Sequence, residues 1–95
     1  MIEFRWDNKK ADNNLKKHGV SFEEAKSVFY DERSLLIHDP VHYVNEDRFI
    51  ILGISIKVRV LVVCHCYREN DTIIRIISAR KANRHEQQNY REVER

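Results

Sequence analysis

Side chains able to bind and cleave a phosphodiester recur along the predicted strands of this sequence and at their ends. They are Glu46, Arg48, Arg59, His65, Tyr67, Arg75, Arg80 and Lys81. Arginine binds phosphate oxygens through a bidentate fork, and histidine or glutamate can move a proton near neutral pH. If a base takes the proton of a ribose 2′-hydroxyl, that oxygen can attack the adjacent phosphorus while arginines stabilise the added negative charge. Such chemistry needs no metal.

Each of these residues also has a plain structural interpretation. An arginine on an exposed strand is often a solvated position whose stem covers apolar neighbours. His65 is flanked by Val63 and Tyr67 on its strand face, and it is as readily a packing histidine as a base. Glu46 could pair locally with Arg48, which shares its strand face. Physical reasoning alone therefore predicts a domain that is compatible with nucleic acid.

Length and composition predict one folded domain over residues 1–95. The chain is 42% hydrophobic and 34% charged, which favours a packed core over disorder. Residues 1–56 hold 8 basic and 10 acidic side chains, whereas residues 57–95 hold 9 basic and 5 acidic ones, so positive charge accumulates in the second part. No apolar run approaches about 18 residues and no secretory signal is visible, so we expect a cytoplasmic protein that does not enter a membrane.

The two cysteines, Cys64 and Cys66, stand on either side of His65. Residues two apart on a strand point to the same face, but their side chains run parallel and seldom form a disulfide. A zinc site needs four ligands, and the sequence has no second cluster to complete one. We therefore expect reduced thiols, no metal and no cofactor, and a metal-binding regulator built on these three residues is the weakest alternative.

The first part of the chain predicts two helices. Phe4 and Trp6 belong to a short opening strand, after which Asp7 is the N-cap of a helix that runs to about His18. Gly19 is the expected C-cap, and His18 before it is expected to interact favourably with the helix C-terminus.

The second helix has the clearest local signal. Ser21 followed by Glu24 is typical of a capping box, in which each side chain satisfies a backbone N–H near the helix start. The helix is expected to end near Tyr30 or Asp31. Its buried face is predicted to consist of Phe22, Ala25, Val28 and Phe29.

The rest of the chain predicts strands and a final helix. Strands are expected at 35–37, at 47–56 and at 58–67, with a loop from Asp39 through Asn45. A tight hairpin over 68–71 leads to the last strand at 72–79, and residues 82–94 form the third helix. Gly53 is expected to mark a bulge or a close approach of the backbone.

The strand over 58–67 sets the expected arrangement of the layers. Its even positions, from Val58 to Cys66, are all apolar and are predicted to face the helices. In particular, Val60, Val62 and Cys64 are expected to share a core with the second helix. The short connections favour an antiparallel meander. The predicted fold class is α+β, with the N-terminal helices on one face of a twisted antiparallel sheet and a C-terminal helix.

The order of several short motifs resembles the BrnT family of toxins over about residues 2–92. The matching residues are Phe4, Trp6 and Asp7; Lys10, Ala11 and Asn14; the string Lys17-His18-Gly19-Val20-Ser21-Phe22-Glu23-Glu24-Ala25; Val28, Phe29 and Asp31; Glu46, Arg48 and Gly53; the string Arg75-Ile76-Ile77-Ser78-Ala79-Arg80 with Ala82; and Glu86 and Tyr90. The joint occurrence of the two strings in this order makes the resemblance specific.

The resemblance implies a RelE-like fold and a toxin of a bacterial type II toxin–antitoxin pair. It implies a ribonuclease that cuts RNA without a metal cofactor and thereby inhibits translation. It also implies a small DNA-binding partner, a BrnA-like antitoxin, through which the pair reaches operator DNA and represses its own operon. The expected complex is a heterotetramer of two toxin and two antitoxin chains.

Residue roles follow from the matched motifs and from the predicted strands together. The motif-matched catalytic candidates are Glu46, Arg48 and Arg80, and strand geometry adds His65. Arg59, Tyr67 and Lys81 are expected to contact RNA. The alternative function is a catalytically silent module that docks the antitoxin and acts as a co-repressor.

Overall fold

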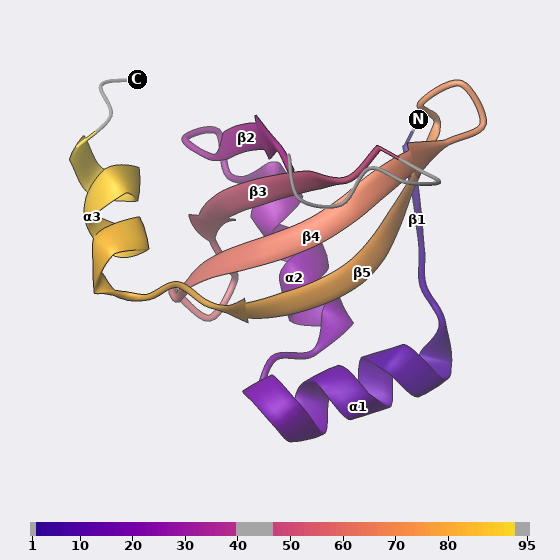
Figure 1. Cartoon of the computed structure of the whole chain (residues 1–95), viewed down its shortest axis with the longest axis horizontal. Helices are drawn as coiled ribbons and strands as arrows, with labels where there is room; N and C mark the ends of the chain where they lie inside the picture. Colours follow the sequence, from indigo (N-terminus) through magenta and orange to yellow (C-terminus); the bar gives the residue numbers. More distant parts are fainter. Residues whose placement is uncertain (1, 40–46, 93–95) are drawn as a thin grey trace.

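A five-stranded sheet with the order β1-β5-β4-β3-β2 forms the centre of the molecule (Figure 1). The computed structural model describes residues 2–39 and 47–92. The strands are β1 (Glu3–Arg5), β2 (Leu35–His38), β3 (Phe49–Ile54), β4 (Val60–Arg68) and β5 (Ile73–Lys81). Strands β2 to β5 pair in antiparallel fashion, as predicted, whereas β1 adds a parallel strand at the β5 edge.

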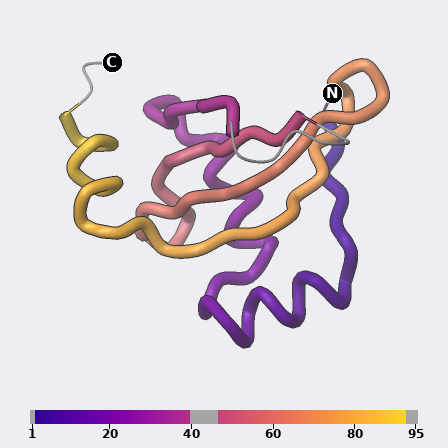
Figure 2. Tube along the Cα trace, viewed as in Figure 1, coloured from indigo at the N-terminus to yellow at the C-terminus, as the bar shows by residue number. Residues whose placement is uncertain are grey.

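Three helices and one 3₁₀ turn flank this sheet in the described ranges. They are α1 (Asn8–His18), α2 (Phe22–Ser27), the turn η1 (Val28–Tyr30) and α3 (Arg84–Glu92). Helix α2 crosses behind the sheet, α1 lies along the outer edge of β5, and α3 lies beside the strand ends (Figure 2). The predicted α+β arrangement is therefore confirmed. Among the described residues, no helix combines the length and the apolar character that crossing a membrane requires.

The predicted helix caps are present, with one difference. The Asp7 side chain accepts a hydrogen bond from the Lys10 N–H, and Gly19, at φ +70°, ends α1 in the left-handed region. The Ser21 hydroxyl oxygen accepts from the Glu24 N–H at 3.0 Å. The Glu24 carboxylate, however, binds Arg59 and Ser55 instead of returning to Ser21, so only half of the expected capping box forms.

The face of β4 that packs on the helices differs from the prediction. Leu61 and Val63 are fully buried against α2, whereas Val62 packs in a second cluster with Tyr90 of α3. The predicted common core of Val60, Val62 and Cys64 with α2 was therefore wrong. Both faces of β4 carry apolar residues, so alternation along the strand does not identify the helix side. Val58 precedes the strand in a turn at φ +60° and is 77% exposed.

The close approach at Gly53 and the β-bulge of the sheet lie at different positions. A Cβ on Gly53 would lie 2.9 Å from Cγ1 of Val28, which confirms a close approach of the backbone at this position. The β-bulge lies elsewhere, between Cys64 and His65 on β4, where β5 accommodates the extra residue Ile77.

Candidate functional site

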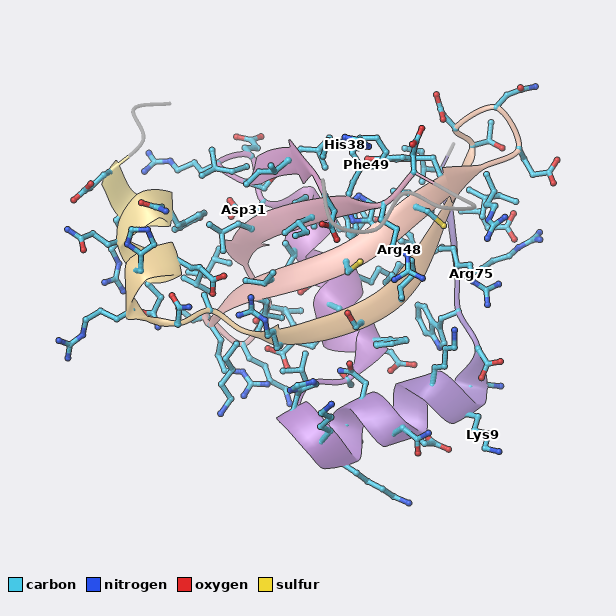
Figure 3. All side chains as sticks on the ribbon, viewed as in Figure 1. Lys9, Asp31, His38, Arg48, Phe49 and Arg75 are labelled. Atoms are coloured by element: carbon cyan, nitrogen blue, oxygen red, sulfur yellow. The ribbon has the colours of Figure 1, made fainter. Side chains whose placement is uncertain are left out.

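The sheet face opposite α2, called the open face below, carries arginines from several strands. The pairing registers place Arg5 of β1 directly beside Arg75 of β5, and Arg75 beside Cys66 of β4. Since Phe4 packs on the helix-side core and pairs with Ile74, alternation turns Arg5 and Arg75 to the open face. Arg68, Arg80 and Arg48 extend the same face. Figure 3 shows Arg48 and Arg75 in front of the sheet, on the side away from α2.

A groove of about 390 Å³ on this face brings several of the predicted residues together. It is lined by His18, Asp39, Arg48, Ile50, Val62, Cys64, Ile77, Ser78, Ala79 and Arg80. Its floor is made of strand residues from β3, β4 and β5, and its charged groups come from the surrounding ends of elements. The groove thus combines guanidinium groups, an imidazole and a carboxyl group over an apolar floor.

Arg80 is fixed by the first turn of α3. Its Nη1 and Nη2 donate to the two carboxylate oxygens of Glu86 at 2.8 and 2.9 Å. Glu86 and Asn83 also form a reciprocal capping box, in which each backbone N–H reaches the other's side chain. The hydrogen bond from Arg80 lowers the pKa of Glu86, which is therefore ionised. The Arg80 fork consequently stands in one defined position beside α3.

Arg48 lies at the opposite side of the groove, immediately before β3. Its carbonyl oxygen accepts a hydrogen bond from the Asp39 N–H at 2.8 Å, which ties the segment after β2 to the start of β3. Burial raises the pKa of the Cys64 thiol, and the charge of nearby Arg48 opposes that rise without cancelling it. Cys64 is thus a protonated thiol in the groove floor, close to a guanidinium group.

Comparison with known proteins assigns the chain to a family. Residues 6–86 match the family described as "Ribonuclease toxin, BrnT, of type II toxin-antitoxin system". The chain belongs to the BrnT family. It is a ribonuclease toxin of a type II toxin–antitoxin system, and this class of toxin has a cognate antitoxin.

A solved structure supports the fold of this BrnT family member. The crystal structure of the Brucella abortus ribonuclease toxin BrnT is 20% identical in sequence and has a TM-score of 0.65. The similarity covers 88% of the present chain and 100% of the other. No match was found among curated proteins.

Arg59 of this BrnT family toxin lies on the helix side, away from the groove. Its guanidinium group binds the buried Glu24 carboxylate, and Nη2 also donates to the Gly19 carbonyl oxygen at 3.1 Å. Burial acts to raise the pKa of Glu24, but hydrogen bonds from Arg59 and Ser55 outweigh it and hold that pKa below its ordinary 4.5. The structure therefore places Arg59 apart from the groove, and its contact with RNA stays a prediction.

His65 is also on the helix side, where it is 0% exposed. Its ring lies 4.7 Å from that of Phe29 between centroids, and its Nδ1 lies 3.2 Å from the Val63 carbonyl oxygen. Burial lowers the pKa of His65 to about 4. This placement fits the packing role that the sequence left open, and the predicted role of His65 as proton acceptor stays a prediction.

The other predicted residues lie outside the groove or outside the described residues. Tyr67 is half-buried on the helix side, with its ring 5.2 Å from that of Phe49 between centroids. Lys81 is exposed at the end of β5 and is not among the groove-lining residues. Glu46 falls outside the described residues. Of the candidates named from the sequence, Arg48 and Arg80 are therefore the two that the groove brings together.

The sequence analysis did not place His18 among the site residues. It matched His18 to the family resemblance and also gave it a capping role, and the end of α1 places it at the groove with Arg48 and Arg80. The signal that could have found it is the Lys17-His18-Gly19 string, which belongs to the family resemblance.

Neighbouring positions of the segment from Cys64 to Cys66 lie on opposite sides of β4. Cys64 lies on the open face, whereas His65 lies on the helix side, so neighbouring positions of the strand point apart. Within residues 2–39 and 47–92, no group of three or more His, Cys, Asp or Glu side chains is placed to hold a metal ion. The alternative of a regulator built on Cys64, His65 and Cys66 therefore has no geometric support.

Proposed function

We propose that this toxin binds and cleaves RNA in the groove between Arg48 and Arg80. The observation that carries the proposal is the placement of both motif-matched arginines over one apolar floor on the open face. In the proposed reaction, the two guanidinium groups hold the scissile phosphate and stabilise the charge that develops on it. A base takes the 2′-hydroxyl proton, and no metal takes part. Glu46 stays a candidate for a role in this step.

The other arginines of the open face support a polyanionic substrate. Arg5 and Arg75 stand directly opposite each other on paired strands, an arrangement that is unfavourable for like charges. Glu3 offsets part of this cost through its contact with Arg5 at 2.9 Å. A nucleic-acid backbone crossing the face would offset more, because each phosphate brings a negative charge close to the guanidinium groups.

The proposed partner is a BrnA-like antitoxin that covers the groove with an acidic or amphipathic segment. Such a segment would neutralise the arginines and exclude RNA at the same time. We propose further that the complex is a heterotetramer in the cytoplasm, and that it represses its operon through the DNA-binding antitoxin. The toxin itself has no direct part in operator binding in this scheme.

Cleavage of a labelled single-stranded RNA by purified toxin tests the proposal. Arg48→Ala and Arg80→Ala are expected to lose activity, whereas Arg84→Ala on the exposed side of α3 is the matched control and keeps it. Cleavage in excess EDTA is expected to equal cleavage without it. Full activity in both groove variants would contradict the site. An inactive parent that still binds the antitoxin and strengthens operator binding would instead support the silent co-repressor.

A further inference from the structure

His18 is the one histidine that lines the arginine groove in the part of the chain that the structure describes. His65 is buried on the other side of the sheet, and His38 lies beside Asp47 at 3.6 Å between Nε2 and Oδ1. Histidine is the side chain best suited to exchange a proton near neutral pH. We propose that His18 accepts the 2′-hydroxyl proton during RNA cleavage and that Asn14 positions it. The inference rests on the proposed function of the groove.

A gap in the sheet allows α1 to reach the groove. Strand β1 pairs only with residues 73–75 of β5, so the outer edge of β5 beyond Arg75 has no strand beside it among the described residues. Asn14 of α1 fills this place. The Ala79 N–H donates to Asn14 Oδ1 at 3.1 Å, and Asn14 Nδ2 donates to the Ala79 carbonyl oxygen at 2.8 Å. The amide thus reproduces the hydrogen bonds of a missing strand, and Figure 1 shows α1 beneath this end of β5.

The same amide fixes two groups of the groove relative to each other. Asn14 and His18 are four residues apart, so they lie on one face of α1. Ala79 immediately precedes Arg80, which points to the opposite side of the strand. A clamp between Asn14 and Ala79 therefore sets the position of His18 relative to Arg80 in the groove that both line, although the two belong to opposite ends of the chain.

The backbone after His18 is held as well. Asn14 Nδ2 also donates to the Val20 carbonyl oxygen at 3.0 Å. Asn14 is only 7% exposed, so these bonds are protected from water. Capping by itself does not call for such a frame, because Lys16 and Lys17 already place positive charge at the end of α1. Rigid support of this kind is what a reacting group requires.

The proposed step transfers a proton from the ribose to His18 and breaks the RNA backbone. A ring nitrogen of neutral His18 takes the proton of the ribose 2′-hydroxyl, and the 2′-oxygen forms a new bond to phosphorus. The bond from phosphorus to the 5′-oxygen breaks, and the leaving oxygen keeps the electron pair and takes a proton from water. The products are a 2′,3′-cyclic phosphate and a 5′-hydroxyl end, and the imidazolium returns its proton to solvent.

The test compares His18→Ala with the parent toxin on a single-stranded RNA oligonucleotide, with and without free imidazole. If His18 is the base, its removal should lower kcat by at least about 100-fold while KM changes little. Free imidazole should then restore a large part of the lost activity. Activity close to the parent's, or a loss that imidazole does not restore, overturns the proposal. Melting curves and antitoxin binding establish that the variant is folded.

Asn14→Ala tests the positioning role, with Asn13→Ala on the exposed face of α1 as its matched control. We expect Asn14→Ala to lower kcat by about tenfold or more at unchanged KM, at a temperature where both variants are fully folded. Equal kcat values in the two variants, with only the melting temperature of Asn14→Ala lowered, overturn the positioning role.

Arg80→Ala in the same assay separates the inference from the proposed function. If Arg80→Ala and Arg48→Ala cleave like the parent, the groove is not the site and both proposals fail together. If these variants are impaired while His18→Ala is not, the groove stands and the role of His18 fails.

Discussion

The two faces of β4 use similar side chains for opposite purposes. On the helix side, Leu61, Val63 and His65 are completely enclosed, and the imidazole there is a neutral packing group. On the open face, Val62 and Cys64 form an apolar floor, and arginines stand around it. Residue type along this strand therefore does not assign a role. Burial makes the central histidine part of the core, and the groups able to do chemistry lie at the edges of the open face.

The largest difference between the faces should appear when a carboxylate is added to each. Val63→Asp is expected to abolish cooperative unfolding, since an unpaired buried carboxylate costs more than the stability of a small domain. Cys64→Asp, the neighbouring position on the open face beside Arg48, should stay folded and lose RNA cleavage. Thermal melting of the two variants makes the comparison. A parental melting curve for Val63→Asp would show that the face is wrongly assigned.

Substitution of Arg80 on the open face should affect the cleavage rate, whereas substitution of Arg59 on the helix side should affect stability. Arg80→Ala removes a charge-assisted contact worth about 2–3 kcal/mol, which is roughly 30- to 150-fold in cleavage rate. Arg80→Lys should also be impaired, because lysine keeps the charge but loses the fork. Arg59→Ala on the helix side should instead lower the melting temperature and leave the cleavage rate per folded molecule near that of the parent. A large rate loss in Arg59→Ala, without loss of stability, would reverse the assignment.

Acid should act on the enclosed imidazole. Burial lowers the pKa of His65 from 6.5 to about 4. Between these two pH values His65 is therefore protonated in the unfolded chain and neutral in the folded chain. The free energy of unfolding should therefore decrease as the pH is lowered, by about 2.5 kcal/mol between pH 7 and pH 4.5. Urea unfolding at the two pH values measures this loss. In His65→Leu the loss should be much smaller, and an unchanged pH dependence would refute the buried neutral state.

The smallest effect is expected from two serines. Ser21→Ala removes the N-cap of α2 and should cost about 1 kcal/mol of unfolding free energy. Ser78→Ala, exposed on the open face, should change that free energy by much less. Equal losses in the two variants, measured by urea unfolding, would mean that the Ser21 cap adds no stability of its own.

Local signals predicted most of the fold, because their causes lie within a few residues of one another. The caps at Asp7, Gly19 and Ser21 depend on neighbouring backbone groups, and the structure has all three. The face of β4 could not be predicted, since both of its sides are apolar. The position of His18 at the groove depends on the contact between Asn14 and Ala79, which are 65 residues apart in the chain. No periodicity in the sequence encodes such a contact.

The amide that completes the β5 edge also bears on self-association of the chain. An uncovered strand edge can form hydrogen bonds with another chain, and Asn14 occupies both backbone groups of Ala79 in the second half of β5. The other end of the sheet is different. Strand β2 has no strand on its outer side within the described residues, and its Leu36 and Ile37 are 55% and 51% exposed. Aggregation of the free toxin should therefore start at β2, and a lysine at position 37 should suppress it without touching the groove.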